Sequence, residues 1–126
     1  MAITEALCRR LARILGGKAQ HENNECSIMV KRNLHATILG KKYDTEHEIV
    51  IQSLKNGRSL NTGEITLLQR EVQLFVRQAT KLGLRVSAVH NHWLFDKPRL
   101  LYVHVESVEN PIRFARKLAS ILKRLK

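Results

Sequence analysis

Three segments of the chain repeat apolar residues at the spacing of an α-helix. Apolar positions recur every three or four residues over residues 3–15, 68–82 and 112–125, with polar residues between them. This period predicts three amphipathic helices, each with one side buried. Glycines follow the first helix at Gly16-Gly17 and the second at Gly83, where C-terminal caps are expected.

Residues typical of helix starts precede the same segments. Thr4 is the expected N-cap of the first helix. Thr66 and Gln69 have the spacing of a capping box before the second helix, and Glu71 in its first turn is explained by the helix dipole. Asn110-Pro111 combines an N-cap with proline at the first helical position, which marks the start of the third helix.

The stretches between the helices are rich in β-branched residues and predict strands. The expected strands are residues 26–31, 35–39, 46–54, 85–92 and 100–107, with a short extended piece at 59–65 and a polar loop at 18–25. The short connection between the last two strands makes them an antiparallel pair. In the resulting order, a helix stands at each end of the chain and one stands between the strands. This order predicts an α+β fold: an antiparallel sheet with helices packed on one face, in a two-layer sandwich.

Length and composition fit one ordinary globular domain. The 126 residues predict a single α+β domain over 1–126, with an N-terminal amphipathic helix in 1–17 and a core over about 26–126. The longest apolar runs are far shorter than 18 residues, so we expect no membrane partner. The first residues lack the apolar stretch of a signal peptide, and we therefore expect a cytoplasmic protein in which Cys8 and Cys26 are reduced, partly buried thiols.

The chain is strongly basic. Its 22 Lys and Arg residues exceed its 11 Asp and Glu residues, which gives a net charge of +11 and a pI near 10.3. A pI above 9 is typical of nucleic-acid binders, and a basic nucleic-acid-binding module is one alternative function. The basic residues are dispersed in twos and threes and gather only in the last helix, which equally fits a solubilising surface. Aromatic residues make up only 5%, too few for a base-stacking platform.

The last two strands separate histidines from aliphatic residues. Because side chains alternate between the two faces of a strand, positions of one parity share a face. If like parity pairs with like, one face of the hairpin is aliphatic and seats the helices. The other face then carries His90, His92, Tyr102, His104 and Glu106.

Three imidazoles on adjacent strands are suited to holding a metal ion. His90, His92 and His104 are the candidate metal ligands, and a divalent ion such as zinc is the candidate cofactor, because first-row metals take nitrogen ligands. The pattern also fits metal-free acid–base chemistry, since the ordinary pKa of histidine is near 6.5. Histidines on a half-exposed sheet can also be purely structural, with hydrogen bonds to neighbours or a role in a dimer contact.

The loop before the last strand adds further candidates. Arg99 fits an anion clamp near the hairpin and equally an ion pair with Asp96. Trp93 and Phe95 either line a pocket or hold the loop against the body of the protein. The remaining ligand-binding candidates are Asn91, Tyr102 and Glu106.

Several of these residues have the order found in a known family. Gly63-Glu64, Glu71, the run from Ala88 to His92, Pro98-Arg99-Leu100 and His104 resemble the LppY/LpqO family, a bacterial domain of unknown function named after mycobacterial predicted lipoproteins. The likeness covers residues 28–122 and implies a site but no reaction. Longer members look like tandem copies of this unit, which implies that two such chains associate as a homodimer, through the open sheet face.

The chain departs from that family at two points. Members often show a basic-x-Asp-Leu pattern, where this chain has Lys31-Arg32-Asn33-Leu34, so any function of that carboxylate elsewhere does not carry over. The lipobox-like segment of a lipoprotein is also missing from this sequence.

Three functional hypotheses follow. In the first, the histidine face of a small bacterial domain binds a metal ion or a small anionic ligand. A hydrolytic version would use the metal to activate water and Arg99 to orient an anion, although no residue identifies a nucleophile and the sequence leaves open whether the protein is an enzyme. The second is the nucleic-acid-binding module. The third is a structural dimerisation domain whose polar sheet face is an interface.

Overall fold

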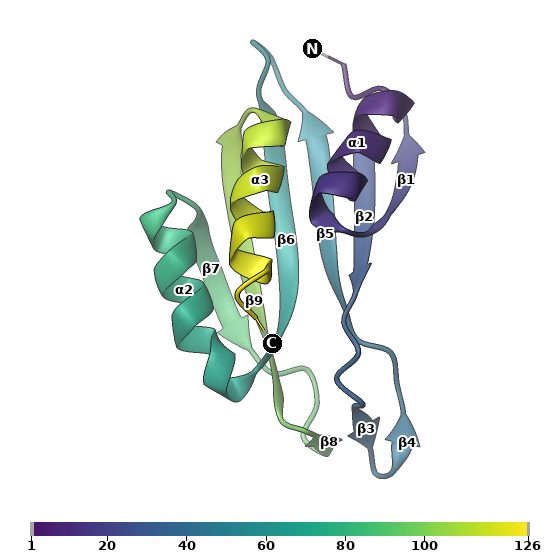
Figure 1. Ribbon diagram of the computed structural model, residues 1–126, viewed down its shortest axis with the longest axis vertical. Coiled ribbons are helices and arrows are strands. Elements are labelled where there is room, and N and C mark those ends of the chain that lie inside the picture. Colours follow the sequence, from purple (N-terminus) through teal and green to yellow (C-terminus); the bar gives the residue numbers. More distant parts are fainter. Residues whose placement is uncertain (1, 126) are drawn as a thin grey trace.

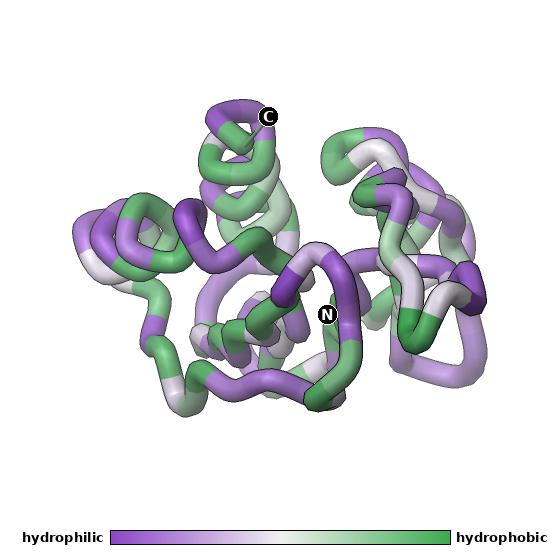
Figure 2. Tube along the Cα trace, turned by 90° about the horizontal axis from the view of Figure 1, so that it is seen from below, coloured by the Kyte–Doolittle hydropathy of each residue, from purple (hydrophilic) through white to green (hydrophobic). Residues whose placement is uncertain are grey.

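The sheet of the protein has six antiparallel strands in the order β1-β2-β5-β6-β9-β7. A computed structural model describes residues 2–125 and places the helices on one face of this sheet (Figures 1 and 2). This is the predicted α+β architecture. The elements are α1 (Glu5–Leu15), β1 (Lys18–Glu22), β2 (Glu25–Lys31), β3 (Thr37–Ile38), β4 (Lys41–Lys42), β5 (Glu46–Ser53), β6 (Ser59–Leu68), a 3₁₀ turn (Gln69–Glu71), α2 (Val72–Lys81), β7 (Arg85–His90), β8 (Asp96–Lys97), β9 (Leu100–Glu109) and α3 (Pro111–Leu122).

Helix α1 begins and ends as the sequence indicates. The Thr4 side chain accepts a hydrogen bond from the Leu7 amide at 3.0 Å, the interaction expected of an N-cap. Gly16 ends the helix in the left-handed conformation with φ 78°. A Cβ atom on Gly17 would lie 2.5 Å from the Met29 carbonyl oxygen, so only glycine lets the chain turn this closely against β2.

A disulfide joins Cys8 of α1 to Cys26 of β2. Both residues are fully buried. The expectation of two reduced thiols is therefore wrong. The sequence could not show the pairing because it arises only when α1 packs against β2, which brings together two residues that are 18 positions apart.

Two extended segments differ from the sequence prediction. Residues 18–25, predicted as a loop, form β1 and a tight turn that pairs it with β2. The expected short piece at 59–65 is instead the ten-residue strand β6, which pairs along its whole length with β9. In consequence β6 lies at the middle of the sheet, between β5 and β9.

The start of the second helix also differs. Thr66 belongs to β6, so the predicted capping box with Gln69 is wrong. The 3₁₀ turn starts at Gln69, and α2 follows at Val72. The carboxylate of Glu71 accepts a hydrogen bond from the Leu68 amide at 2.8 Å, so Glu71 caps this helix start with its side chain. Gly83 follows α2 with φ 84°, as expected of a C-terminal cap.

The apolar core fills the space between the helices and the sheet. Phe75 of α2 and Phe114 of α3 are fully buried, as are Ile49 of β5 and Val103 of β9. Asn110 caps α3 by accepting from the Ile112 amide at 2.9 Å. Because Val103 belongs to this core, the predicted aliphatic face of β9 does seat the helices. Within residues 2–125 no helix has both the length and the apolarity needed to cross a membrane.

A small three-stranded sheet in the order β4-β3-β8 extends from one end of the molecule (Figure 1). The predicted strand 35–39 is thereby reduced to two paired residues. A second apolar cluster, with buried Ala36, Leu100 and Tyr102, lies where this small sheet meets the main one. This cluster covers one end of the open sheet face, which is the face that carries no helix.

Candidate functional site

The open face of the sheet brings together one carboxylate and three imidazoles. In the register of the strands, His104 of β9 lies opposite Glu64 of β6 on one side and Ala88 of β7 on the other. His90 lies opposite Tyr102, and His92 follows two residues after His90. The parity argument from the sequence is therefore confirmed, because like parity pairs with like between β7 and β9 in this region.

The polar atoms of the four side chains converge. His90 Nε2 lies 2.9 Å from His104 Nε2. Glu64 Oε2 lies 3.1 Å from His92 Nε2 and 3.1 Å from His104 Nε2. One ligand atom each from Glu64, His90 and His92 lies within 4.8 Å of the others, close enough for all three to hold one metal ion. We call Glu64, His90, His92 and His104 the histidine cluster.

Such close ring nitrogens need a hydrogen atom or a metal ion between them. Each neutral imidazole has one protonated and one unprotonated nitrogen. When His90 and His104 face each other through the same atom, Nε2, a proton or a metal ion must separate their lone pairs. The carboxylate of Glu64 adds negative charge at the same point, which favours a bound cation.

The buried side chain of Tyr102 packs against the histidine cluster. Its ring stacks on that of His92, with centroids 3.5 Å apart and planes inclined by 6°. Tyr102 is only 6% exposed, and burial, reinforced by the nearby Tyr43 hydroxyl, raises the pKa of its phenol well above the usual value. A neutral, buried ring therefore fixes the plane of the His92 imidazole.

A groove adjoins the histidine cluster on the same face. It has a volume of about 370 Å³ and is lined by the cluster residues Glu64 and His104. Two more carboxylates line it, those of Glu48 and Glu106, together with the hydroxyl groups of Thr62 and Ser87. The groove offers a small molecule hydrogen-bond acceptors and hydroxyls next to the cluster.

A larger cavity, of about 530 Å³, lies elsewhere. It is lined by the segment from Lys31 to Thr45, including His35, Lys42 and Tyr43. None of the four cluster residues lines it. The larger cavity therefore lacks the converging donor atoms of the histidine cluster. The groove beside the histidines is the better candidate for a ligand site.

The predicted site residues fall into two groups. The structure brings His90, His92 and His104 together, stacks Tyr102 on His92 and places Glu106 on the adjoining groove. The side chains of Asn91 and Arg99 contact the loop instead, although the backbone carbonyl oxygen of Asn91 lies 3.4 Å from His90 Nδ1. The Asn91 amide donates to the Trp93 carbonyl oxygen at 3.2 Å. The Arg99 guanidinium pairs with Asp96, Nε to Oδ1, at 3.5 Å, so the ion-pair alternative is observed rather than an anion clamp.

The two aromatic residues of the loop do not line the groove and are largely exposed. Trp93 is 48% exposed and Phe95 is 62% exposed. Only the edge of Trp93 contacts the site, with its ring centroid 6.2 Å from that of His92. The exposure of both residues therefore needs a further explanation.

Glu64 was missed by sequence reasoning as a member of the site. The sequence places it in a short extended piece before a helix, where a carboxylate needs no functional explanation. The signal available was the resemblance, because Gly63-Glu64 is among the residues that carry it, whereas the alternating burial of residues 59–68 is visible only in the structure. Pairing that strand with β9 places Glu64 opposite His104.

A second polar cluster lies on the helix side and is structural. Arg32 Nη1 donates to Glu71 Oε1 at 2.7 Å, and Arg32 also donates to the Thr66 carbonyl oxygen. Burial would raise the pKa of Glu71, but the hydrogen bonds from Arg32 and the Leu68 amide, with the positive charge of Arg32, hold it below its usual value. Both charges are satisfied by protein groups, and neither faces the groove.

Comparison with known proteins gives one match. Residues 9–124 match the family model described as Domain of Unknown Function (DUF1259). No curated protein matches the chain. No solved structure matches it either.

Proposed function

Since the chain belongs to the family described as Domain of Unknown Function (DUF1259), whose description assigns no activity, we propose a function from the site itself. The histidine cluster binds a divalent transition metal, and zinc is the first choice. Glu64, His90 and His92 are the ligands, because their donor atoms lie within 4.8 Å of one another. His104 Nε2 lies beside them, 3.1 Å from Glu64 Oε2, and can take the place of one of the three.

The spacing of the donor atoms carries this proposal. In a tetrahedral zinc site with bonds of 2.0–2.1 Å, neighbouring ligand atoms lie about 3.3 Å apart. Glu64 Oε2 and His92 Nε2 lie 3.1 Å apart, and the donor atoms of all three ligands lie within 4.8 Å of one another, so small movements of the side chains admit the ion. Imidazole nitrogens with one carboxylate form the donor set that zinc and similar first-row ions take in proteins.

The adjoining groove favours a site that binds a further molecule over a closed structural one. A catalytic zinc keeps three protein ligands and leaves one position open to water or substrate. A molecule in the groove would meet that position next to His104. Its hydroxyl or amide groups would bond to Glu48 and Glu106, and an anionic group would bind the metal directly. A metal-bound water would supply a nucleophile for hydrolysis near neutral pH.

The disulfide bears on where this chemistry takes place. Disulfides persist in oxidising compartments and are rare in the reducing cytosol. The buried Cys8–Cys26 bond therefore favours an oxidising compartment over the cytoplasm that the sequence led us to expect. We propose that the metal site operates there.

Calorimetric titration tests the metal site. Protein stripped with chelator is titrated with ZnCl₂, and we expect one ion per chain. A His90→Ala/His104→Ala variant should lose at least a hundredfold in affinity, because two nitrogen donors are removed. Glu64→Gln should weaken binding with the fold intact, because a neutral amide replaces the charged ligand atom.

The matched control is His35→Asn. His35 lies outside the cluster, is exposed and has a left-handed backbone with φ 53°, which asparagine tolerates. This variant should bind zinc like the native chain. Equal affinity and stoichiometry in the native protein and the double histidine variant would show that the cluster is not a metal site.

A further inference from the structure

The end of the molecule that carries the small sheet presents exposed apolar side chains. Leu39, in the turn between β3 and β4, is 75% exposed. Leu94 and Phe95, in the loop between β7 and β8, are 72% and 62% exposed, and Trp93 is 48% exposed. The two loops are neighbours, because the Leu39 amide donates to the Phe95 carbonyl oxygen at 3.4 Å. We call these four residues the apolar tip.

Nothing within the described part of the chain covers the apolar tip. Its loops belong to the part of the molecule that extends away from the helix layer (Figure 1). Leu39 has a left-handed backbone with φ 51°, a conformation that side chains with a Cβ atom adopt at a cost. An isolated exposed leucine would need no explanation, but four large apolar residues on two adjoining loops form a patch that marks an interaction site.

Cations surround the apolar tip. Lys41 and Lys42 follow Leu39 in the chain, and Lys97 and Arg99 follow Phe95; all four are exposed. The carboxylate of Asp96 is buried and pairs with Arg99. The tip therefore has an apolar centre and a rim with a net positive charge.

We propose that the apolar tip docks on an anionic lipid surface. Tryptophan and phenylalanine side chains favour the boundary between lipid headgroups and acyl chains, and lysine and arginine are attracted to anionic headgroups. Because the apolar residues project from loops, they can enter a lipid layer, whereas a protein partner would need a matching hollow. The expectation of no membrane partner rested on the absence of a spanning segment, which does not address surface docking. The proposal does not depend on metal binding.

Trp93 makes the test direct, because it is the single tryptophan of the chain. The native protein is titrated with vesicles of phosphatidylcholine containing a third phosphatidylglycerol, and separately with vesicles of phosphatidylcholine alone. We expect the emission of Trp93 to shift to shorter wavelength with the anionic vesicles and much less with the neutral ones. Lipids brominated on the upper acyl chain should quench it, which places the indole at the interface.

An apolar variant tests the centre of the tip. Leu94→Ser/Phe95→Ser keeps the reporter and should reduce vesicle binding at least tenfold, because two exposed side chains can no longer enter the lipid. Leu54→Ser is the matched control. Leu54 is also exposed, at 40%, but it lies in the turn between β5 and β6, and its replacement should leave binding unchanged.

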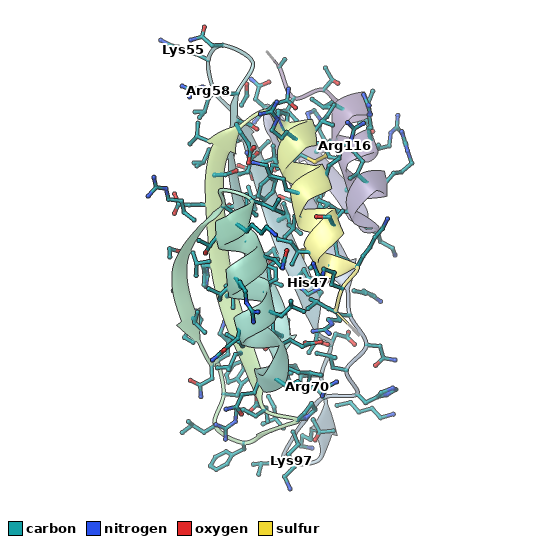
Figure 3. The ribbon with its side chains drawn as sticks, turned by 60° about the vertical axis from the view of Figure 1, so that its left-hand side comes forward. His47, Lys55, Arg58, Arg70, Lys97 and Arg116 are labelled. Carbon is teal, nitrogen blue, oxygen red and sulfur yellow. A yellow bond between two sulfur atoms is a disulfide. The ribbon has the colours of Figure 1, made fainter. Side chains whose placement is uncertain are left out.

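A charge variant tests the rim. Lys41→Gln/Lys97→Gln should weaken binding to anionic vesicles by roughly 25-fold, at about fivefold for each cation near the surface. Lys55→Gln/Arg58→Gln removes the same charge at the opposite end of the molecule (Figure 3) and should have little effect. Equal losses in both variants would mean that the net charge of the chain, and not the tip, attracts the vesicles.

Two results would overturn the proposal outright. One is an unchanged emission of Trp93 with anionic vesicles at low salt. The other is a protein that sediments as a dimer, becomes a monomer in the Leu94→Ser/Phe95→Ser variant and binds no vesicles. The second result would assign the apolar tip to contact between two copies of this chain.

Discussion

His47 lies on the helix side of β5, and burial fixes its protonation state. It is 3% exposed, and its Nδ1 accepts a hydrogen bond from the Thr66 amide at 3.1 Å. Burial, together with the nearby charge of Arg32, lowers the pKa of His47 to about 4. The folded protein therefore keeps this imidazole neutral at pH values where the unfolded chain protonates it.

The stability of the protein should consequently fall as the pH is lowered from about 6.5 towards 4. The unfolded chain gains a proton at His47 near pH 6.5, while the folded chain does not until about pH 4. The free energy of unfolding should drop by roughly 2–3 kcal/mol across this window. Urea denaturation at pH 7, 6, 5 and 4 measures it. His47→Asn keeps an acceptor for Thr66 but does not titrate, so parallel pH curves for this variant and the native chain would contradict the assignment.

Arg32 and Glu71 form a buried ion pair whose loss should be costly. Their side chains are 12% and 7% exposed. Arg32→Met should lower the free energy of unfolding by about 3 kcal/mol, because it leaves the Glu71 carboxylate buried without its partner. Arg9→Met is the matched control, since Arg9 pairs with Glu5 on the surface at 3.9 Å, and it should leave the denaturation midpoint unchanged. A similar small effect of both variants would show that water replaces the lost partner of Glu71.

The residues of the histidine cluster were predictable to different degrees. His90, His92 and His104 could be placed on one face because they belong to a hairpin, whose short loop fixes the partner strands. Glu64 could not, because its strand lies some 40 positions away in the chain, and only the order of the strands in the sheet brings it to His104. For Arg99 the sequence left an anion clamp and an ion pair open, because a guanidinium beside a predicted site looks the same in sequence whether or not a carboxylate neutralises it.

At the scale of elements, the Cys8–Cys26 disulfide ties α1 to the sheet. It closes a loop of 18 residues, for which the chain-entropy model gives about 3 kcal/mol of stabilisation. Cys8→Ser/Cys26→Ser should lower the free energy of unfolding by that amount, and dithiothreitol should do the same to the native chain. Denaturant titrations with and without reductant measure both effects. A native protein with two titratable thiols under oxidising conditions would contradict the bond itself.

Elements were predictable where burial is one-sided. Helices α1, α2 and α3 each pack a single apolar stripe on the sheet, so their spacing is visible in sequence. Strand β1 lies at the sheet edge with nearly every residue exposed. Hydrogen bonds to β2 hold it in place. Its sequence therefore shows no alternation of apolar and polar residues. Strand β6 contains Thr66 near its end. The Thr66 hydroxyl donates to the Glu46 carbonyl oxygen, but its residue type suggests a helix cap.

At the scale of the whole molecule, the helices carry many exposed cations, whereas carboxylates line the groove. The helices carry exposed cations, among them Arg113 of α3 and Arg116 of the same helix (Figure 3). The carboxylates of Glu48, Glu64 and Glu106 line the groove on the other face. The net charge of +11 is therefore not a property of the candidate site, and any polyanion should meet the helices first.

This separation makes the nucleic-acid alternative testable apart from metal binding. We expect duplex DNA to bind without sequence preference at low salt, and the affinity to fall about a hundredfold between 50 and 200 mM salt if four phosphates are contacted. Arg113→Gln/Arg116→Gln should reduce the slope of log affinity against log salt by about 2. Glu64→Gln should leave DNA binding unchanged while it weakens zinc binding, because Glu64 lies on the opposite face. Gel shifts at the two salt concentrations measure the effect. A large effect of Glu64→Gln on DNA binding, or none of the arginine variant, would place the polyanion at the groove instead of on the helices.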